Sequence, residues 1–222
     1  MTSPNPRPRR QSDSALESIS DWFDAYTRQI TAGLVVVAIV VGGGWFYGRS
    51  QALKAQRAER AYAAAQQSIP GNLPLAESDL NKLITRYDGT AAALQARLTL
   101  AQLYYDQGKY QQGIESLKKS MPKFEKSDLF ASPAHLLLAA GYEQLHKFLD
   151  AAGEYGSAAK TSRFDQDRQR HESSEARAFL MAGRVDTAKE IWTRLAADSK
   201  GTVAGEARVR LGELTAKAQP KS

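Results

Sequence analysis

The sequence contains no cysteine, which excludes disulfides, thiolate catalysis, zinc ribbons and iron–sulfur ligation. It has only three histidines, His135, His146 and His171, so a site built from several histidine ligands is not expected. It has no phosphate-binding glycine loop, and no serine lies in a nucleophile-elbow context. The sequence therefore favours a protein that is not an enzyme and that carries no cofactor and no metal ion.

Charged side chains are absent from a long segment near the N-terminus, between Gln29 and Gly48. Residues 34–41 within it are continuously apolar, and an aromatic run at 45–47 lies at one end. Twenty helical residues at about 1.5 Å each reach about 30 Å, the thickness of a bilayer core. The segment predicts a single transmembrane helix over 29–48. A buried core helix and a signal peptide cleaved near residues 50–52 remain the alternatives.

The segments on either side of this span have different compositions. Residues 1–11 contain prolines and arginines without an apolar run, and we expect disorder there. The helical pattern that follows, over 12–28, suits either an interfacial amphipathic helix or an outward extension of the span. Residues 49–70 are rich in alanine and basic residues and predict a juxtamembrane helix. A turn at 70–74 then leads into a domain over 71–222.

That last domain contains a repeated pattern with a period near 37 residues. Its aromatic anchors Tyr104, Tyr142 and Phe179 are 38 and 37 residues apart, and a fourth copy begins at 201–208. No stretch alternates with a period of two, so the predicted fold class is all-α. The residues expected to pack within the helix hairpins are Leu100, Ala101, Tyr104, Gly108, Tyr110, Leu138, Ala139, Tyr142, Phe148, Ala151, Tyr155, Ala176, Phe179, Gly183, Ala188 and Trp192.

The spacing within each copy predicts two antiparallel helices joined by a tight turn. A small residue lets the helices approach, an aromatic residue one turn later fills the gap, and Gly108 or Gly183 permits the turn. Ser132 followed by Pro133 predicts a helix N-cap. The pattern resembles the tetratricopeptide repeat (TPR), which implies a TPR-like helical-hairpin domain. The usual packing tryptophan is replaced by Arg97, His135 and Glu172, and the period exceeds the usual 34.

Function in such a domain would come from its surface, because stacked hairpins leave a groove lined by the first helix of each pair. By the spacing of the repeat, the residues expected to face this groove and a protein partner are Gln102, Tyr105, Asp106, Glu143, Gln144, Arg170, Arg177 and Met181. A tyrosine and a methionine among polar groups suit a peptide or a partner segment. Ordinary solvent-facing residues are the alternative.

A closer resemblance covers nearly the whole chain. The aromatic run Trp45-Phe46-Tyr47, the juxtamembrane residues Ala58, Ala61 and Tyr62, and the last repeat with Ser174-Glu175-Ala176, Gly183-Arg184 and Trp192 resemble the YfgM-type family of ancillary SecYEG translocon subunits. The resemblance implies a bacterial inner-membrane protein with a cytoplasmic tail at 1–28 and a periplasmic repeat domain. It further implies contact with the SecYEG translocon and a PpiD-like chaperone.

The charges near the span disagree with this topology. Within 20 residues of the span, Arg49, Lys54, Arg57 and Arg60 follow it. Arg28 precedes it, with Arg9 and Arg10 at the margin. The positive-inside rule taken alone favours a cytoplasmic repeat domain. Two hypotheses therefore remain: a membrane-anchored adaptor near the translocon, and a cytoplasm-facing scaffold for an envelope or cell-division complex. The net charge of +6 is too diffuse to predict nucleic-acid binding.

Overall fold

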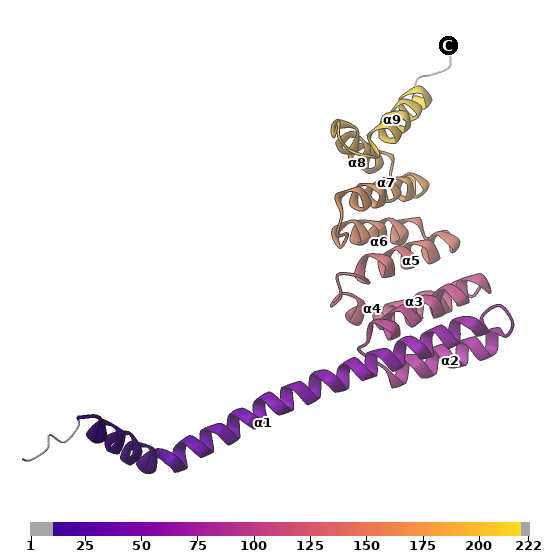
Figure 1. Cartoon of the computed structure of the whole chain (residues 1–222). Coiled ribbons are helices and arrows are strands. Elements are labelled where there is room, and N and C mark those ends of the chain that lie inside the picture. Colours follow the sequence, from indigo (N-terminus) through magenta and orange to yellow (C-terminus); the bar gives the residue numbers. More distant parts are fainter. Residues whose placement is uncertain (1–10, 219–222) are drawn as a thin grey trace, which may run out of the picture. The chain divides into compact units, whose positions relative to one another are not determined.

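The structure is a computed structural model that describes the backbone of residues 11–218 and the side chains of residue 29 and residues 31–216. Within residues 11–218 the chain forms nine helices and no strands, which confirms the predicted all-α class (Figure 1). The chain divides into two compact units, residues 1–53 and residues 54–222. The predicted disorder of residues 1–10 lies outside the described residues.

The helices follow one another with short connections. They are α1 (Gln11–Ser68), α2 (Leu73–Arg86), α3 (Ala91–Asp106), α4 (Tyr110–Phe124), α5 (Ala131–Gln144), α6 (Phe148–Lys160), α7 (Asp165–Met181), α8 (Val185–Ala197) and α9 (Ala204–Ala218). Helix α1 belongs to both units, and helices α2 to α9 belong to the second unit alone.

The first unit contains the apolar part of α1. Its large side chains from Leu34 to Tyr47 are each exposed over more than half of their surface. No residue is buried in the most apolar stretch of this helix. This helix is long and apolar enough to cross a membrane. The backbone forms one helix from Gln11 to Ser68, so the segment over 12–28 and the span belong to the same helix.

The second unit begins with the C-terminal end of α1, which packs on α2 and α3. Ala65 is fully buried in a cluster with Leu80, Leu83 and Leu100, and the Tyr62 hydroxyl lies 2.8 Å from the Thr99 hydroxyl. One face of residues 54–68, with the buried Ala58 and Ala65, therefore packs against the repeat domain. Helix α2 begins inside the stretch expected to be a turn, because the Asn72 side chain accepts a hydrogen bond from the backbone N–H of Leu75.

Three helix hairpins follow, α3–α4, α5–α6 and α7–α8, and α9 packs against α8. Figure 1 shows these helices stacked in chain order. Small residues occupy the closest approaches: Ala101, Ala139 and Ala176 on the first helices are all fully buried. One hydrophobic cluster contains buried residues from each of the helices α3 to α7. A second cluster around Trp192 joins α7, α8 and α9. The predicted arrangement of TPR-like hairpins is confirmed.

The three hairpin turns share one backbone geometry. Gly108, His146 and Gly183 have φ angles of +73°, +54° and +77°. In each turn the N–H of this residue donates three residues back, and the N–H of the next residue donates five residues back. An example is the Lys109 N–H to the Tyr104 carbonyl at 2.8 Å. This is the Schellman helix ending, in which a left-handed residue satisfies carbonyls left free at the end of a helix.

Replacing Gly183 with alanine is expected to lower the free energy of unfolding by about 1 kcal/mol, because a Cβ disfavours a positive φ. No atom lies within 4 Å of the added carbon, so the cost comes from the backbone alone. Thermal unfolding measures it. The matched control is Gly212→Ala in α9, which is expected to be neutral or stabilising. Equal destabilisation by both changes would contradict this explanation.

The predicted N-cap at Ser132 is wrong. Helix α5 begins at Ala131 with Phe130 as the residue before it, so Ser132 lies inside the first turn. Its hydroxyl instead donates to the Ala158 carbonyl of α6 at 3.0 Å. The reason lies in the packing: the serine is buried against the last turn of α6, where the Ala158 carbonyl is within reach of its hydroxyl.

Candidate functional site

Polar side chains replace the packing tryptophan of the TPR in all three hairpins, and each reaches the second helix of its own hairpin. Arg97 of α3 donates to the Ser120 hydroxyl at 3.2 Å. The ring of His135 on α5 lies 2.7 Å from the Glu154 carboxylate, and Glu172 of α7 accepts from Arg194 at 3.0 Å. The hairpins are thus joined by polar bridges where the consensus has an aromatic contact.

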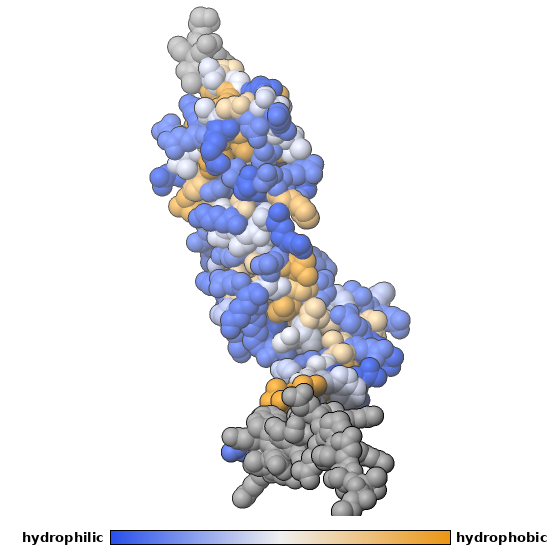
Figure 2. All heavy atoms as spheres, turned by 60° about the vertical axis from the view of Figure 1, so that its left-hand side comes forward, coloured by the Kyte–Doolittle hydropathy of each residue, from blue (hydrophilic) through white to orange (hydrophobic). Residues whose placement is uncertain are grey.

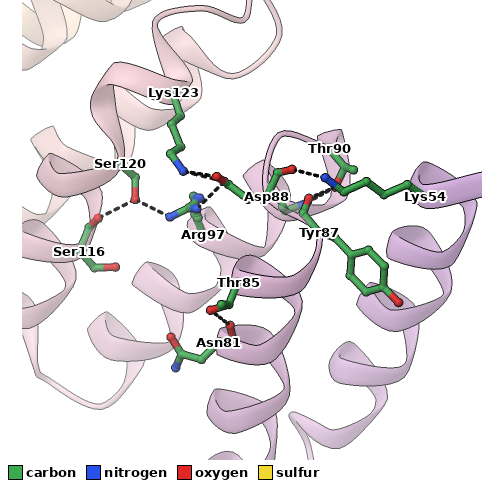
Figure 3. A network of polar contacts seen from close by, with 11 residues as sticks. Lys54, Asn81, Thr85, Tyr87, Asp88, Thr90, Arg97, Ser116, Ser120 and Lys123 are labelled. Carbon is green, nitrogen blue, oxygen red and sulfur yellow. Dashed lines mark hydrogen bonds and ion pairs between the residues drawn. The ribbon is translucent and has the colours of Figure 1, made fainter. Parts of the chain in front are cut away.

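Asp88, in the α2–α3 connection, extends the first of these bridges into a network (Figure 3). Its carboxylate accepts from Lys123 at 2.6 Å and from Arg97 at 3.0 Å, and its backbone carbonyl accepts from Lys54 at 2.7 Å. The two cations lower the pKa of Asp88, with the bond from Lys123 contributing most. The network ties residues from α1, α3 and α4 to one loop, so we assign it a structural role.

A pocket of about 360 Å³ opens where α5 to α9 converge. Its lining residues are Glu143 of α5, Tyr155 of α6, Arg177, Leu180 and Met181 of α7, Trp192 of α8 and Arg210 of α9. Met181 is 64% exposed although it is apolar, and Trp192 is fully buried. The pocket therefore combines an apolar wall with charged groups that remain in contact with solvent.

The charges in this pocket influence one another. Burial and the neighbouring carboxylate of Glu143 raise the pKa of Tyr155 to about 12, while Arg177 opposes the rise. Tyr155 therefore stays protonated at physiological pH. Arg177 donates to the Ser174 hydroxyl at 2.8 Å, and within residues 31–216 it makes no ion pair. Its guanidinium thus retains donors for a ligand.

The structure brings together three of the residues predicted to face the partner groove, since Glu143, Arg177 and Met181 line this pocket. Gln102 and Asp106 lie elsewhere, on the exposed face of α3, where they hydrogen-bond to each other at 2.8 Å. Gln144 is exposed near the end of α5. The remaining two predicted residues, Arg170 and Tyr105, lie in different surroundings.

Arg170 lines a second hollow of about 410 Å³, at the α4–α5 and α6–α7 connections. Leu129 and Phe164 line the same hollow, and both are more than 60% exposed. Burial lowers the pKa of His171, which lies there too, so this histidine is neutral at pH 7. The repeat pattern did not indicate this hollow, because the connections supply half of its lining and helical spacing does not apply to them.

Tyr105 corrects the groove prediction, because only 7% of its surface is exposed. Its ring lies between two glycines, Gly113 of α4 and Gly141 of α5. The α carbons of these glycines have no side chain, and the aromatic ring fills the space that two side chains would occupy. The hydroxyl has no hydrogen-bond partner within the described residues, and burial raises the pKa of this tyrosine. The two glycines were the signal in the sequence that could have indicated a buried ring.

Glu175 of α7 gives a pH-dependent prediction. Burial and the nearby Glu172 carboxylate raise its pKa, and its carboxylate packs against Gly156 of α6. A raised pKa in the folded state gives stability that is present at acidic pH and is lost as the pH rises through the folded-state pKa. The change Glu175→Gln is therefore expected to raise the melting temperature at pH 7 and to have little effect at pH 4.

Thermal unfolding of the two proteins at both pH values measures this difference. The exposed Glu190 of α8 provides the control, since Glu190→Gln changes the net charge by the same amount at a solvated position. A lower melting temperature of Glu175→Gln at pH 7 would show that the carboxylate stabilises the fold.

The rest of the surface is mainly polar. On the face drawn in Figure 2, hydrophilic side chains cover most of the repeat domain, and small hydrophobic patches lie between them. Among the described residues no three histidine or acidic side chains lie together as a metal site would require. The side chains that line the two hollows offer hydrogen bonds, charge pairs and contact with apolar groups.

Comparisons with known proteins agree with this architecture. The model of the tetratricopeptide repeat-like domain family matches residues 20–202. Two similar crystal structures contain nearly identical TPR-like repeats of a kinesin light chain candidate from Podosopora anserina. One is 20% identical over 67% of this chain and 77% of that chain, with a TM-score of 0.52. The other is 18% identical over 75% and 99% of the two chains, with a TM-score of 0.51. No curated protein matches the sequence.

Proposed function

The chain belongs to the tetratricopeptide repeat-like domain family, and from this premise we propose that it is a non-enzymatic adaptor that holds protein partners at a membrane. The family fold is typically a scaffold for protein–protein contacts. The single observation that carries the proposal is the presence, in one chain, of this fold and an apolar helix with no buried residue in its most apolar window.

The proposed anchor is the helix over residues 29–48. A row of exposed valines, with Leu34 and Ile39, would be unfavourable in water but suits a lipid environment. Trp45 and Tyr47 suit the interface between lipid and water. An anchor also concentrates the repeat domain at the membrane surface, so a weak interaction with a membrane-bound partner becomes sufficient.

The finer form of the proposal follows from the resemblance to the YfgM-type family. We propose a bacterial inner-membrane protein with its tail in the cytoplasm and its repeat domain in the periplasm, in contact with the SecYEG translocon and a PpiD-like chaperone. Photo-crosslinking in cells tests it, with a crosslinker placed at exposed positions of α5 and α7. Capture of translocon or chaperone subunits is expected, and repeated failure to capture either would reject this form.

A cytoplasm-facing scaffold is the second candidate, and the distribution of basic residues favours it. Arg49, Arg57 and Arg60 are exposed on α1 just after the span. The positive-inside rule places such residues in the cytoplasm, although large domains can be translocated despite it. The partners would then belong to an envelope or cell-division complex.

The absence of cysteine makes topology directly measurable, because any introduced cysteine is the only thiol. Thr193→Cys on the exposed surface of α8 and Ser3→Cys in the tail form a matched pair. A maleimide that cannot cross membranes is applied to intact spheroplasts. Labelling of residue 193 alone supports the periplasmic adaptor, and labelling of residue 3 alone before lysis supports the cytoplasmic scaffold.

A further inference from the structure

The pocket between α5 and α9 has an excess of hydrogen-bond donors. Trp192 is fully buried, its ring lines the pocket, and its Nε1–H has no acceptor within the described residues. A buried donor without an acceptor costs free energy. The protein covers this N–H, so the donors that a ligand in the pocket can reach come from other side chains.

Two arginines provide the accessible donors. Arg177 makes no ion pair within the part of the chain that the structure describes, and most of its N–H groups are free of protein acceptors. Among the described residues Arg210 pairs only with Glu213 on its own helix, at 3.1 Å, and both side chains are about half exposed. Exposed pairs of this kind contribute little and exchange readily. Both guanidinium groups can therefore turn to a ligand.

The one carboxylate in the pocket is already engaged. Glu143 lies against the Tyr155 hydroxyl, and this contact contributes to the raised pKa of the tyrosine. Counting formal charges, Arg177 and Arg210 exceed Glu143 by one. The unpaired groups are cations and N–H donors, so the complementary ligand supplies negative charge and oxygen acceptors.

The pocket also has an apolar requirement. Leu180 and Met181 line the pocket together with the indole. The exposure of the apolar Met181 side chain to water is unfavourable, and contact with an apolar group would remove this free-energy cost. A volume of about 360 Å³ is at the lower end for binding pockets, which suits one large side chain with its flanking backbone. Methionine adapts to side chains of different shapes, and this favours a short peptide motif over a single rigid ligand.

We propose that this pocket binds a segment of a partner protein in which a large apolar side chain lies beside acidic residues. The apolar side chain enters next to Trp192 and Met181, and the flanking carboxylates meet Arg177 and Arg210. The inference rests on the proposed adaptor function, and it specifies the chemistry of the partner at one pocket.

Peptide binding to the full chain in detergent micelles tests the proposal. The probe is a fluorescein-labelled peptide with the central sequence Glu-Phe-Glu, and the two comparison peptides carry Lys-Phe-Lys and Glu-Ala-Glu. Fluorescence anisotropy gives the three affinities. Glu-Phe-Glu is expected to bind roughly tenfold more tightly than either comparison peptide. Equal binding of Glu-Phe-Glu and Lys-Phe-Lys would overturn the proposal.

Variants of the protein then locate the binding. Arg177→Glu and Met181→Glu are exposed substitutions, and each is expected to weaken Glu-Phe-Glu binding by roughly tenfold. The matched control is Lys118→Glu on the exposed face of α4, which makes the same charge change as Arg177→Glu outside the pocket. Arg177→Glu is also expected to improve the binding of Lys-Phe-Lys, a gain that a partly unfolded protein could not produce. No difference between Arg177→Glu and Lys118→Glu would overturn the proposal.

The two proposals fail in different ways. If crosslinking in cells captures a partner through the repeat domain but Glu-Phe-Glu shows no preference, the adaptor function stands and the pocket chemistry is rejected. If the peptide binds as expected but no partner is captured in cells, the pocket chemistry stands and the adaptor function is rejected.

Discussion

Replacing Gly141 with alanine is expected to lower the free energy of unfolding by about 3 kcal/mol. An ideal Cβ at this position would lie 2.6 Å from Cζ of Tyr105 and 2.8 Å from Cγ1 of Ile114, both far inside van der Waals contact. The ring cannot move away easily, because Gly113 on α4 contacts its other side. Urea unfolding of the full chain in detergent, followed by circular dichroism, measures the loss.

A double-mutant cycle tests whether the clash with the ring is the cause. Tyr105→Ala alone is expected to cost about 3–5 kcal/mol by leaving a cavity. In the double variant the new methyl group occupies part of that cavity, so the combined cost is expected to be smaller than the sum. The matched control is Gly153→Ala in α6, where no atom lies within 4 Å and alanine is expected to stabilise the helix. Additive costs in the cycle would contradict the steric explanation.

Replacing Trp192 with alanine is expected to lower the free energy of unfolding by about 4 kcal/mol, at the upper end for single substitutions. Trp192 is the largest fully buried side chain, and it joins α7, α8 and α9 through contacts with Ala176 and Ala207 in one cluster. Its removal leaves a cavity that helices held by their neighbours cannot close completely. Chemical denaturation of the full chain measures the change.

The location of the damage provides the sharper measurement. In a repeat domain each hairpin contacts mainly its neighbours, so local stability depends on nearby contacts. Hydrogen exchange in Trp192→Ala is expected to accelerate in α7 to α9 and to change little in α3 and α4. Trp192→Phe, which keeps most of the apolar volume and removes the unpartnered N–H, is expected to cost much less. Uniform acceleration along the domain would show that the repeats unfold as one unit.

Sequence reasoning identified the hairpins because each depends on local rules. A positive φ at a helix end requires a glycine or a tolerated substitute, and that requirement recurs at residues 108, 146 and 183. The buried alanines Ala101, Ala139 and Ala176 recur for a similar reason, since two helices approach closely only over a small side chain. Such signals repeat at a constant spacing, so a single sequence is enough to detect them.

The same reasoning predicted part of the candidate site. Glu143, Arg177 and Met181 lie on the first helices of hairpins and face outward at helical spacing, and they do line one pocket. Tyr105 has the same spacing but is buried, because the glycines beside it belong to α4 and α5. Helical periodicity describes one helix at a time and contains no information on which neighbour lies opposite.

Composition and spacing were enough to predict the all-α class, the apolar helix near the N-terminus and the hairpin period, because both act within a few turns of the chain. Packing between helices, by contrast, set the partners with which Arg97, His135 and Glu172 form their bridges, and it made Trp192 and Arg210 neighbours of Glu143 in one pocket. The partners in these bridges, and the pairs that Glu143 forms with Trp192 and Arg210 in the pocket, are separated by 19 to 67 residues along the chain. Their contacts depend on the packing between helices, which the folded backbone alone defines.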